Sequence, residues 1–158
     1  MKINSDFKDL LQLLSDGSVR YLVVGGYAVM KYTEPYNTKD LDIWIDPTQE
    51  NANRVLEVLR RFGAPDHQVT VDDLTNPDLI YQIGVEPVRV DIMGSVSGLK
   101  FEEAWEHRVE TDYGGVLAPV LSIDDIIAAK KATGRAKDRI QARELLRAKS
   151  RPSQRSQE

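Results

Sequence analysis

Two aspartates separated by one residue lie inside a run that is otherwise typical of a β-strand. Asp40 and Asp42 belong to the segment TKDLDIWI at 38–45, although Asp is depleted in strands and normally occupies turns or helix caps. On a strand, residues two apart point to the same face, with Cβ atoms about 6–7 Å apart. The two carboxylates therefore repel each other unless a cation lies between them. Mg²⁺ fits, because it is a hard cation that prefers oxygen ligands and is often shared with substrate phosphates.

A third aspartate, Asp91, lies in the β-branched run VRVDIM at 88–93. If its strand lies beside the first, Asp91 completes a three-carboxylate site. Two metal ions about 3.5–4 Å apart at such a site can clamp the attacking and leaving oxygens of an in-line phosphoryl displacement. Arg89 shares a face with Asp91, and we interpret it either as a salt-bridge partner or as a phosphate contact.

Two glycines, Gly25 and Gly26, follow the apolar strand-like run YLVV and precede a helical segment. Glycines let the backbone approach a ligand closely, and a helix N-terminus offers N–H groups to phosphate. A tight turn explains such a pair equally well. The order of the features is more specific, because Asp40 follows Gly26 by 14 residues and Asp91 comes later in a strand of its own.

This order resembles the nucleotidyltransferase superfamily typified by DNA polymerase β. The family pattern is an apolar residue with Gly-Gly or Gly-Ser, then Asp-apolar-Asp/Glu-apolar about ten residues later, then an Asp in an apolar strand. The matching residues are Val24-Gly25-Gly26, Asp40-Leu41-Asp42-Ile43 and Val90-Asp91-Ile92. The segments FEEAW at 101–105, IIAAK at 126–130 and GRAKD at 134–138 resemble small bacterial members from toxin–antitoxin and abortive-infection systems.

The resemblance implies an enzyme that needs Mg²⁺ or Mn²⁺ and transfers a nucleoside monophosphate from a nucleoside triphosphate such as ATP, with loss of pyrophosphate. It implies that Asp40 and Asp42 are catalytic ligands of both metals. Asp91 would bind the catalytic metal and help to deprotonate the acceptor hydroxyl. Gly26 stands where other members have Ser, which removes a side-chain phosphate contact.

Further candidates for nucleotide binding flank these motifs. Thr38 precedes the aspartate pair and either hydrogen-bonds a loop of the site or simply begins the strand. Lys130 and Lys137 either reach the triphosphate or lie on a solvent-exposed basic helix. Trp44 continues the face of Asp40 and Asp42, where it either stacks on a base or packs against the protein.

Charge is distributed unevenly along the chain. Residues 1–125 carry a net charge of −11 and residues 126–158 a net charge of +7. An acidic body with a basic C-terminal segment fits a cation site that takes an anionic ligand, and a solvated basic helix on an acidic domain is the alternative. The sequence contains no Cys, which excludes disulfides, thiol catalysis and Cys-ligated metal sites.

Strand and helix patterns alternate along the chain. We expect helices at 7–14, 27–32, 48–62, 101–105, 122–133 and 136–149, and strands at 21–24, 41–45, 79–83 and 88–93, with two more between 109 and 121. This mixture predicts an α/β (α+β) fold with a mixed β-sheet flanked by helices, as in polymerase β-like nucleotidyltransferases. We expect one nucleotidyltransferase domain over 1–149, including the C-terminal helices at 122–149, and a disordered tail over 150–158.

The predicted function is nucleotidyl transfer to a hydroxyl of a protein, an RNA or a small molecule in a toxin–antitoxin-like system. The alternative is a non-catalytic, antitoxin-like module that neutralises a partner protein, a toxin or antitoxin, by contact. No apolar run approaches the roughly 20 residues of a membrane span, and the N-terminus lacks a signal-peptide core. We therefore expect a cytoplasmic protein that does not bind membranes.

Overall fold

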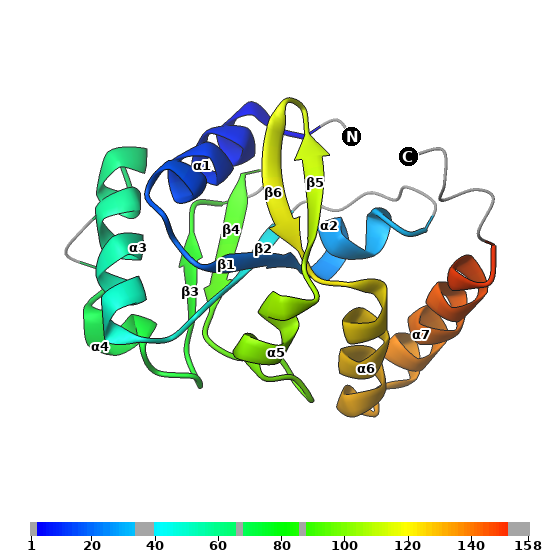
Figure 1. Ribbon diagram of the computed structural model, residues 1–158. Helices are drawn as coiled ribbons and strands as arrows, with labels where there is room; N and C mark the ends of the chain where they lie inside the picture. Colours follow the sequence, from blue (N-terminus) through cyan, green and yellow to red (C-terminus); the bar gives the residue numbers. More distant parts are fainter. Residues whose placement is uncertain (1–2, 34–39, 66–67, 86–87, 152–158) are drawn as a thin grey trace.

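The computed structural model describes residues 3–33, 40–65, 68–85 and 88–151. Within them, strands form one mixed sheet in the order β3-β4-β2-β1-β6-β5 (Figure 1). The strands are β1 Tyr21–Val24, β2 Asp40–Ile45, β3 Ile80–Ile83, β4 Arg89–Met93, β5 Val109–Tyr113 and β6 Val116–Val120. β2 runs parallel to β4 and antiparallel to β1, whereas β3 pairs antiparallel to β4 at one edge. The predicted mixed α/β fold is confirmed.

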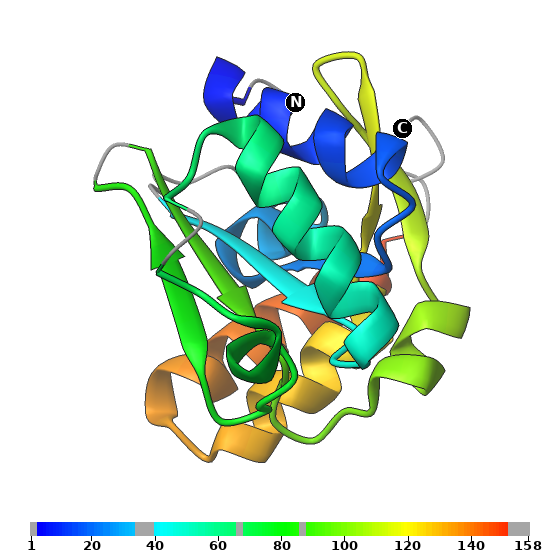
Figure 2. The same ribbon diagram turned by 90° about the vertical axis from the view of Figure 1, so that its left-hand side faces the viewer.

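Helices cover both faces of this sheet. They are α1 Ser5–Asp16, α2 Gly25–Met30, α3 Gln49–Phe62, α4 Val71–Leu74, α5 Phe101–Glu106, α6 Ile123–Thr133 and α7 Ala136–Lys149. Figures 1 and 2 show α1 and α3 packed together on one face, with α6 and α7 on the other side of the molecule. The side chains of Asp40 and Asp42 lie on the face of the sheet that also packs against α2, α5 and α6.

The helix boundaries mostly follow their sequence signals. Thr48 caps α3 through its side chain, and Gly63 ends it with a φ of 94°. Asn4 caps α1, because its side-chain oxygen accepts a hydrogen bond from the Asp6 N–H. The helix expected from residue 27 begins earlier, at Gly25, so the glycine pair forms its first turn. The four-residue α4 was not expected, since it is too short to show a helical period.

Alternation along β2 separates the core from the candidate site. Leu41, Ile43 and Ile45 are buried on the face that packs under α1 and α3. Asp40, Asp42 and Trp44 point to the other face. Trp44 is only 1% exposed and its ring meets Phe101 of α5 edge-on at 5.2 Å. Its packing role is therefore confirmed, and the idea that it stacks on a base is wrong.

Two expectations concern residues outside the described part of the chain. Thr38 lies there, and so does the tail expected over 150–158 apart from Ser150 and Arg151. In the described part, no helix has both the length and the apolarity needed to cross a membrane.

Candidate active site

The strand register brings the aspartates together on one face of the sheet. In the parallel pair β2–β4, Asp42 lies directly beside Asp91, and Asp40 lies beside Arg89. Side chains at paired positions point to the same face, and neighbouring strands lie about 4.8 Å apart. Asp40, Asp42 and Asp91 therefore share one face, as a three-carboxylate site requires.

Gly25 closes one side of this group. It has a φ of 66°, in the left-handed region that favours glycine, and it begins α2 directly after β1. A Cβ atom at this position would overlap the Asp42 carboxylate. The glycine therefore permits a close approach of the α2 backbone to Asp42, which a simple tight turn would not need. Gly26 is the next residue of the same first turn.

Arg89 supplies the positive charge that the carboxylates need. Its Nε and Nη2 donate to the two oxygens of Asp91 at 3.1 and 3.0 Å, and its Nη1 lies 3.9 Å from Asp40 Oδ2. The salt-bridge interpretation of Arg89 is confirmed. The guanidinium thus forms two hydrogen bonds with the buried Asp91 and a longer ion pair with Asp40 on the adjoining strand.

Asp42 has the most perturbed acidity in the group. Burial raises the pKa of Asp42 to about 7, and the negative charges of Asp91 and Asp40 add to the rise, while Arg89 opposes it. A hydrogen bond with the Asp91 carboxyl contributes in the same upward direction. Buried acids with strongly perturbed pKa values are concentrated at functional sites of proteins.

The donor atoms fit a divalent cation. Asp40 Oδ1 is buried and finds no hydrogen-bond partner among the described residues, and carboxylate oxygens are what Mg²⁺ and Mn²⁺ prefer. No group of three His, Cys, Asp or Glu side chains in the described part is yet close enough to hold a metal ion. Arg89 contacts both Asp91 and Asp40 in this arrangement.

The predicted basic residues lie in the C-terminal helices α6 and α7, where one of them forms an ion pair between the two helices. Lys130 pairs with buried Asp138 at 3.4 Å, and Arg135 meets the same carboxylate at 3.0 Å. The Thr133 hydroxyl, followed by these two cations, lowers the pKa of Asp138. Lys137 is exposed. Among the described residues, no hydrogen bond or ion pair joins either lysine to Asp40, Asp42 or Asp91, and Lys130 contacts Asp138 instead.

Sequence reasoning did not single out Gln82, which lies on β3 directly beside Asp91. No local signal marks it. Only the register between β3 and β4 places it next to the carboxylates.

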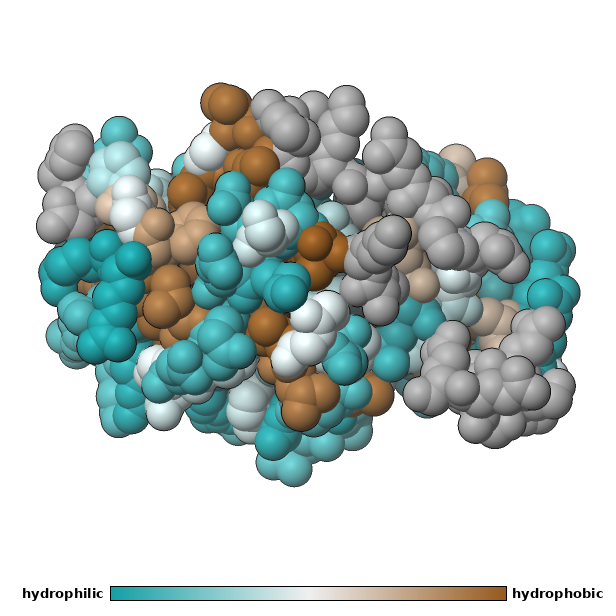
Figure 3. All heavy atoms as spheres, turned by 90° about the horizontal axis from the view of Figure 1, so that it is seen from above, coloured by the Kyte–Doolittle hydropathy of each residue, from teal (hydrophilic) through white to brown (hydrophobic). Residues whose placement is uncertain are grey.

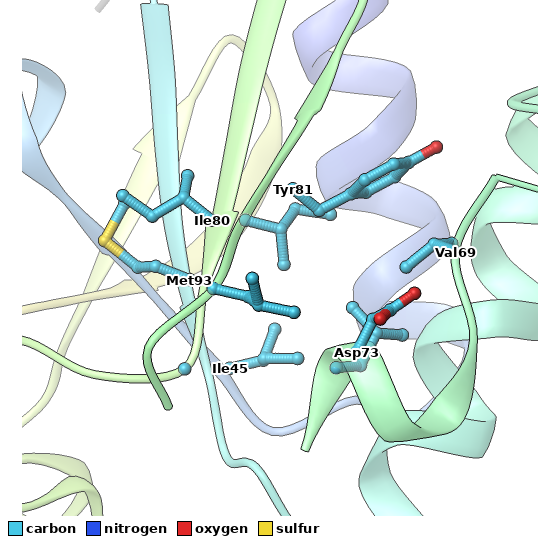
Figure 4. Close-up of a pocket in the computed structure, with 10 residues that line it drawn as sticks. Ile45, Val69, Asp73, Ile80, Tyr81 and Met93 are labelled. Atoms are coloured by element: carbon cyan, nitrogen blue, oxygen red, sulfur yellow. The ribbon is translucent and has the colours of Figure 1, made fainter. Parts of the chain in front are cut away.

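Hollows on the opposite face are separate from this group. A cavity of about 80 Å³ lies behind β3 and β4, among Ile45, Val69, Tyr81 and other mainly apolar side chains (Figure 4). A wider groove runs between α1, α3 and the ends of β3 and β4. Seen from above, apolar surface is concentrated in the half of the molecule that holds α1 and α3 (Figure 3). None of the three aspartates lines either hollow.

Comparison with known proteins gives a family and a fold. A family model described as "Nucleotidyl transferase of unknown function (DUF2204)" matches residues 4–154. The crystal structure of a "putative nucleotidyltransferase" from Thermotoga maritima superposes with a TM-score of 0.60 at 18% identity, covering 89% of this chain and 90% of that chain. The lincomycin-bound structure of the lincosamide antibiotic adenylyltransferase LnuA has a TM-score of 0.54 at 17% identity, covering 90% and 96%. At these identities the two structures show a shared fold. No curated protein matches the sequence.

Proposed function

The chain belongs to the family of nucleotidyl transferases of unknown function (DUF2204), and from that premise we propose its reaction. It transfers a nucleoside monophosphate from a nucleoside triphosphate to a hydroxyl group, with Mg²⁺ or Mn²⁺ held by Asp40, Asp42 and Asp91. The observation that carries the proposal is the register that sets Asp42 beside Asp91. The close approach of Gly25 to Asp42 supports it.

The reaction breaks one phosphoryl bond and forms another. The acceptor oxygen attacks the α-phosphorus, the bond from that phosphorus to the bridging oxygen breaks, and pyrophosphate leaves on the opposite side. The acceptor proton passes to the Asp91 carboxylate, which lies on a rigid strand beside Asp42. When bound, the metal ions neutralise triphosphate charge and favour the ionised acceptor oxygen. Gly25 and Gly26 let the backbone of α2 approach the phosphates.

Arg89 has one role before a cation binds and a second role afterwards. In the absence of a cation it neutralises Asp91 and Asp40. Asp91 accepts a proton only after the guanidinium has released it, and the released Arg89 is then close enough to contact the incoming phosphates. A guanidinium is well suited to that second role, because its planar donors match phosphate oxygens.

The donor and the setting extend the same proposal. The adenylyl group in the name of LnuA makes ATP the first donor to test, and a small hydroxyl compound, a protein and an RNA are the acceptors to compare. Nucleoside triphosphates are made in the cytoplasm, which is where we place the reaction. The toxin–antitoxin setting indicated by the sequence resemblance belongs to this proposal as well.

A purely binding role, in which the chain neutralises a partner protein by contact, fits the site less well. Asp42 is a buried acid beside two other acids, and its raised pKa means that its charged form costs folding free energy at neutral pH. A contact surface gains nothing from such a group. A metal-dependent enzyme needs it.

The test is label transfer. The protein is incubated with Mg²⁺, cell extract and each nucleoside triphosphate labelled at the α-phosphate. The wild type should transfer label and release pyrophosphate, and Asp42→Asn should do neither. Asp9→Asn, which changes an exposed aspartate of α1, is the matched control and should behave as wild type. Absence of transfer from all four triphosphates by the wild type would contradict the proposal.

A further inference from the structure

Four chain positions form one row across the sheet. Val24 pairs with Asp42, Asp42 with Asp91, and Asp91 with Gln82, so the row crosses β1, β2, β4 and β3 in turn. With strands about 4.8 Å apart, the row is about 14 Å long. Gly25, which follows Val24, stands at one end, and Gln82 stands at the other on the edge strand.

The inference rests on the proposed function, which assigns the triphosphate to one end of the row and the acceptor to the other. In an in-line displacement the leaving pyrophosphate and the attacking oxygen lie on opposite sides of the phosphorus. The β- and γ-phosphates belong to the end at Gly25 and Gly26, and the transferred phosphorus lies over Asp42 and Asp91. The acceptor must then approach from the β3 side.

β3 offers two kinds of contact on that side. Gln82 is exposed, and its side-chain amide has no hydrogen-bond partner within the described ranges. Ile80, two residues before Gln82 and therefore on the same face of β3, pairs with Met93 and is 59% exposed. Figure 4 shows Ile80 and Met93 on one side of the strands, with Tyr81, Val69 and Asp73 on the other. An amide and a small apolar ledge therefore lie side by side next to Asp91.

Local charge disfavours a polyanionic acceptor. Arg89 is the cation next to the carboxylates, and it is engaged by Asp91 and Asp40. Ile80, Gln82 and Met93 add no charge. A nucleic-acid backbone would find no cation among these three side chains to pair with its phosphates, whereas a neutral compound needs none.

We propose that β3 forms the acceptor site, in which Gln82 hydrogen-bonds a small hydroxyl compound and Ile80 with Met93 contacts an apolar part of it. Gln82 acts as a positioning residue, because it orients the acceptor without exchanging its proton. A small compound fits better than a protein, because the ledge consists of few side chains and a stable protein contact needs about 800 Å² on each partner.

The experiment follows label into two fractions of cell extract. Extract is separated by ultrafiltration into small molecules and macromolecules, and each fraction is incubated with the protein, Mg²⁺ and triphosphates labelled at the α-phosphate. Label should enter compounds of the small-molecule fraction. Label confined to RNA or protein would overturn the acceptor assignment and leave the proposed function standing. No label in either fraction would contradict the proposed function itself, and the acceptor site with it.

Variants of β3 separate acceptor binding from nucleotide binding. Gln82→Ala should lower kcat/KM for the small-molecule fraction by at least about 5-fold through lost hydrogen bonding and orientation, with nucleotide affinity unchanged. Gln82→Asn keeps the amide and should retain more transfer. Ile80→Thr should raise the KM for acceptor about 3-fold at unchanged kcat, because apolar contact is lost.

Leu117→Thr is the control for these variants, since Leu117 is a 62% exposed residue of β6, on the far side of the sheet order. It should leave both constants as in the wild type. Unchanged kcat/KM in Gln82→Ala, or an equal effect of Leu117→Thr and Ile80→Thr, would remove β3 from the acceptor site.

Discussion

Replacing Asp42 by Asn should stabilise the metal-free protein while abolishing its activity. Burial and two neighbouring carboxylates raise the pKa of Asp42 from 3.8 to about 7 in the folded state. The folded protein therefore binds this proton more tightly than the unfolded chain does. As the pH rises from about 4 to about 7, the free energy of unfolding of the wild type falls, and the loss is complete above about pH 7.

The size of the effect follows from the shift. Three pKa units at about 1.4 kcal/mol each set an upper limit of about 4 kcal/mol. Asp42 keeps some exposure, and Arg89 can reorient toward it, so we expect about 1–3 kcal/mol. Asn has the same shape and no charge. Asp42→Asn should thus match the wild type near pH 4 and exceed its unfolding free energy by that amount near pH 8.

Urea unfolding at several pH values, in the presence of a chelator, measures this difference. Asp9→Asn, at an exposed position, should follow the wild-type profile throughout. Added Mg²⁺ should reverse the order near pH 8, because it stabilises only the chain that keeps its ligand. A wild type and Asp42→Asn with parallel profiles between about pH 4 and pH 8 would refute the burial and repulsion that we assign to Asp42.

Three further predictions concern the cation, the glycine and the basic helix. Mg²⁺ with a nucleoside triphosphate should raise the melting temperature of the wild type in differential scanning fluorimetry, and Asp42→Asn should lose that rise. Gly25→Ala should cost about 1–3 kcal/mol in urea unfolding and lose the same rise, whereas Gly134→Ala, at a nearly equal φ of 69° with nothing within 4 Å, should show only the backbone cost. Lys137→Ala should weaken triphosphate binding at low salt and less at high salt, because exposed charges are screened. A variant affinity equal to that of the wild type at low salt would show that Lys137 is a solvent-exposed residue with no role in binding.

The strands of the site could be predicted because their residues carry a local signal. An aspartate such as Asp42 or Asp91 between β-branched neighbours marks both a strand and an unusual side chain within it. Alternation along 40–45 also predicted that Asp40 and Asp42 share one face of the strand, and the structure agrees. The family pattern added the order of glycines and aspartates, which no single strand reveals.

Register and pairing could not be predicted, because they depend on strands far apart in sequence. The choice between two roles for Arg89 needed its distances to Asp91 and Asp40. Trp44 shares the aspartate face by alternation, yet α5 covers it, and nothing near residue 44 reports on α5. Gln82 is an ordinary polar residue until the pairing with β4 is known.

The most direct test of the central claim compares nucleotide binding with nucleotide transfer in Asp91→Asn. If Asp91 accepts the acceptor proton and binds one metal, the variant should keep much of its affinity for Mg²⁺ and triphosphate. Its transfer rate should fall by about 10²–10⁴-fold, the range of general base contributions. Asp40→Asn and Asp42→Asn should lose both. Transfer by Asp91→Asn at a rate near wild type would contradict the account, because the third aspartate would then have no part in the reaction.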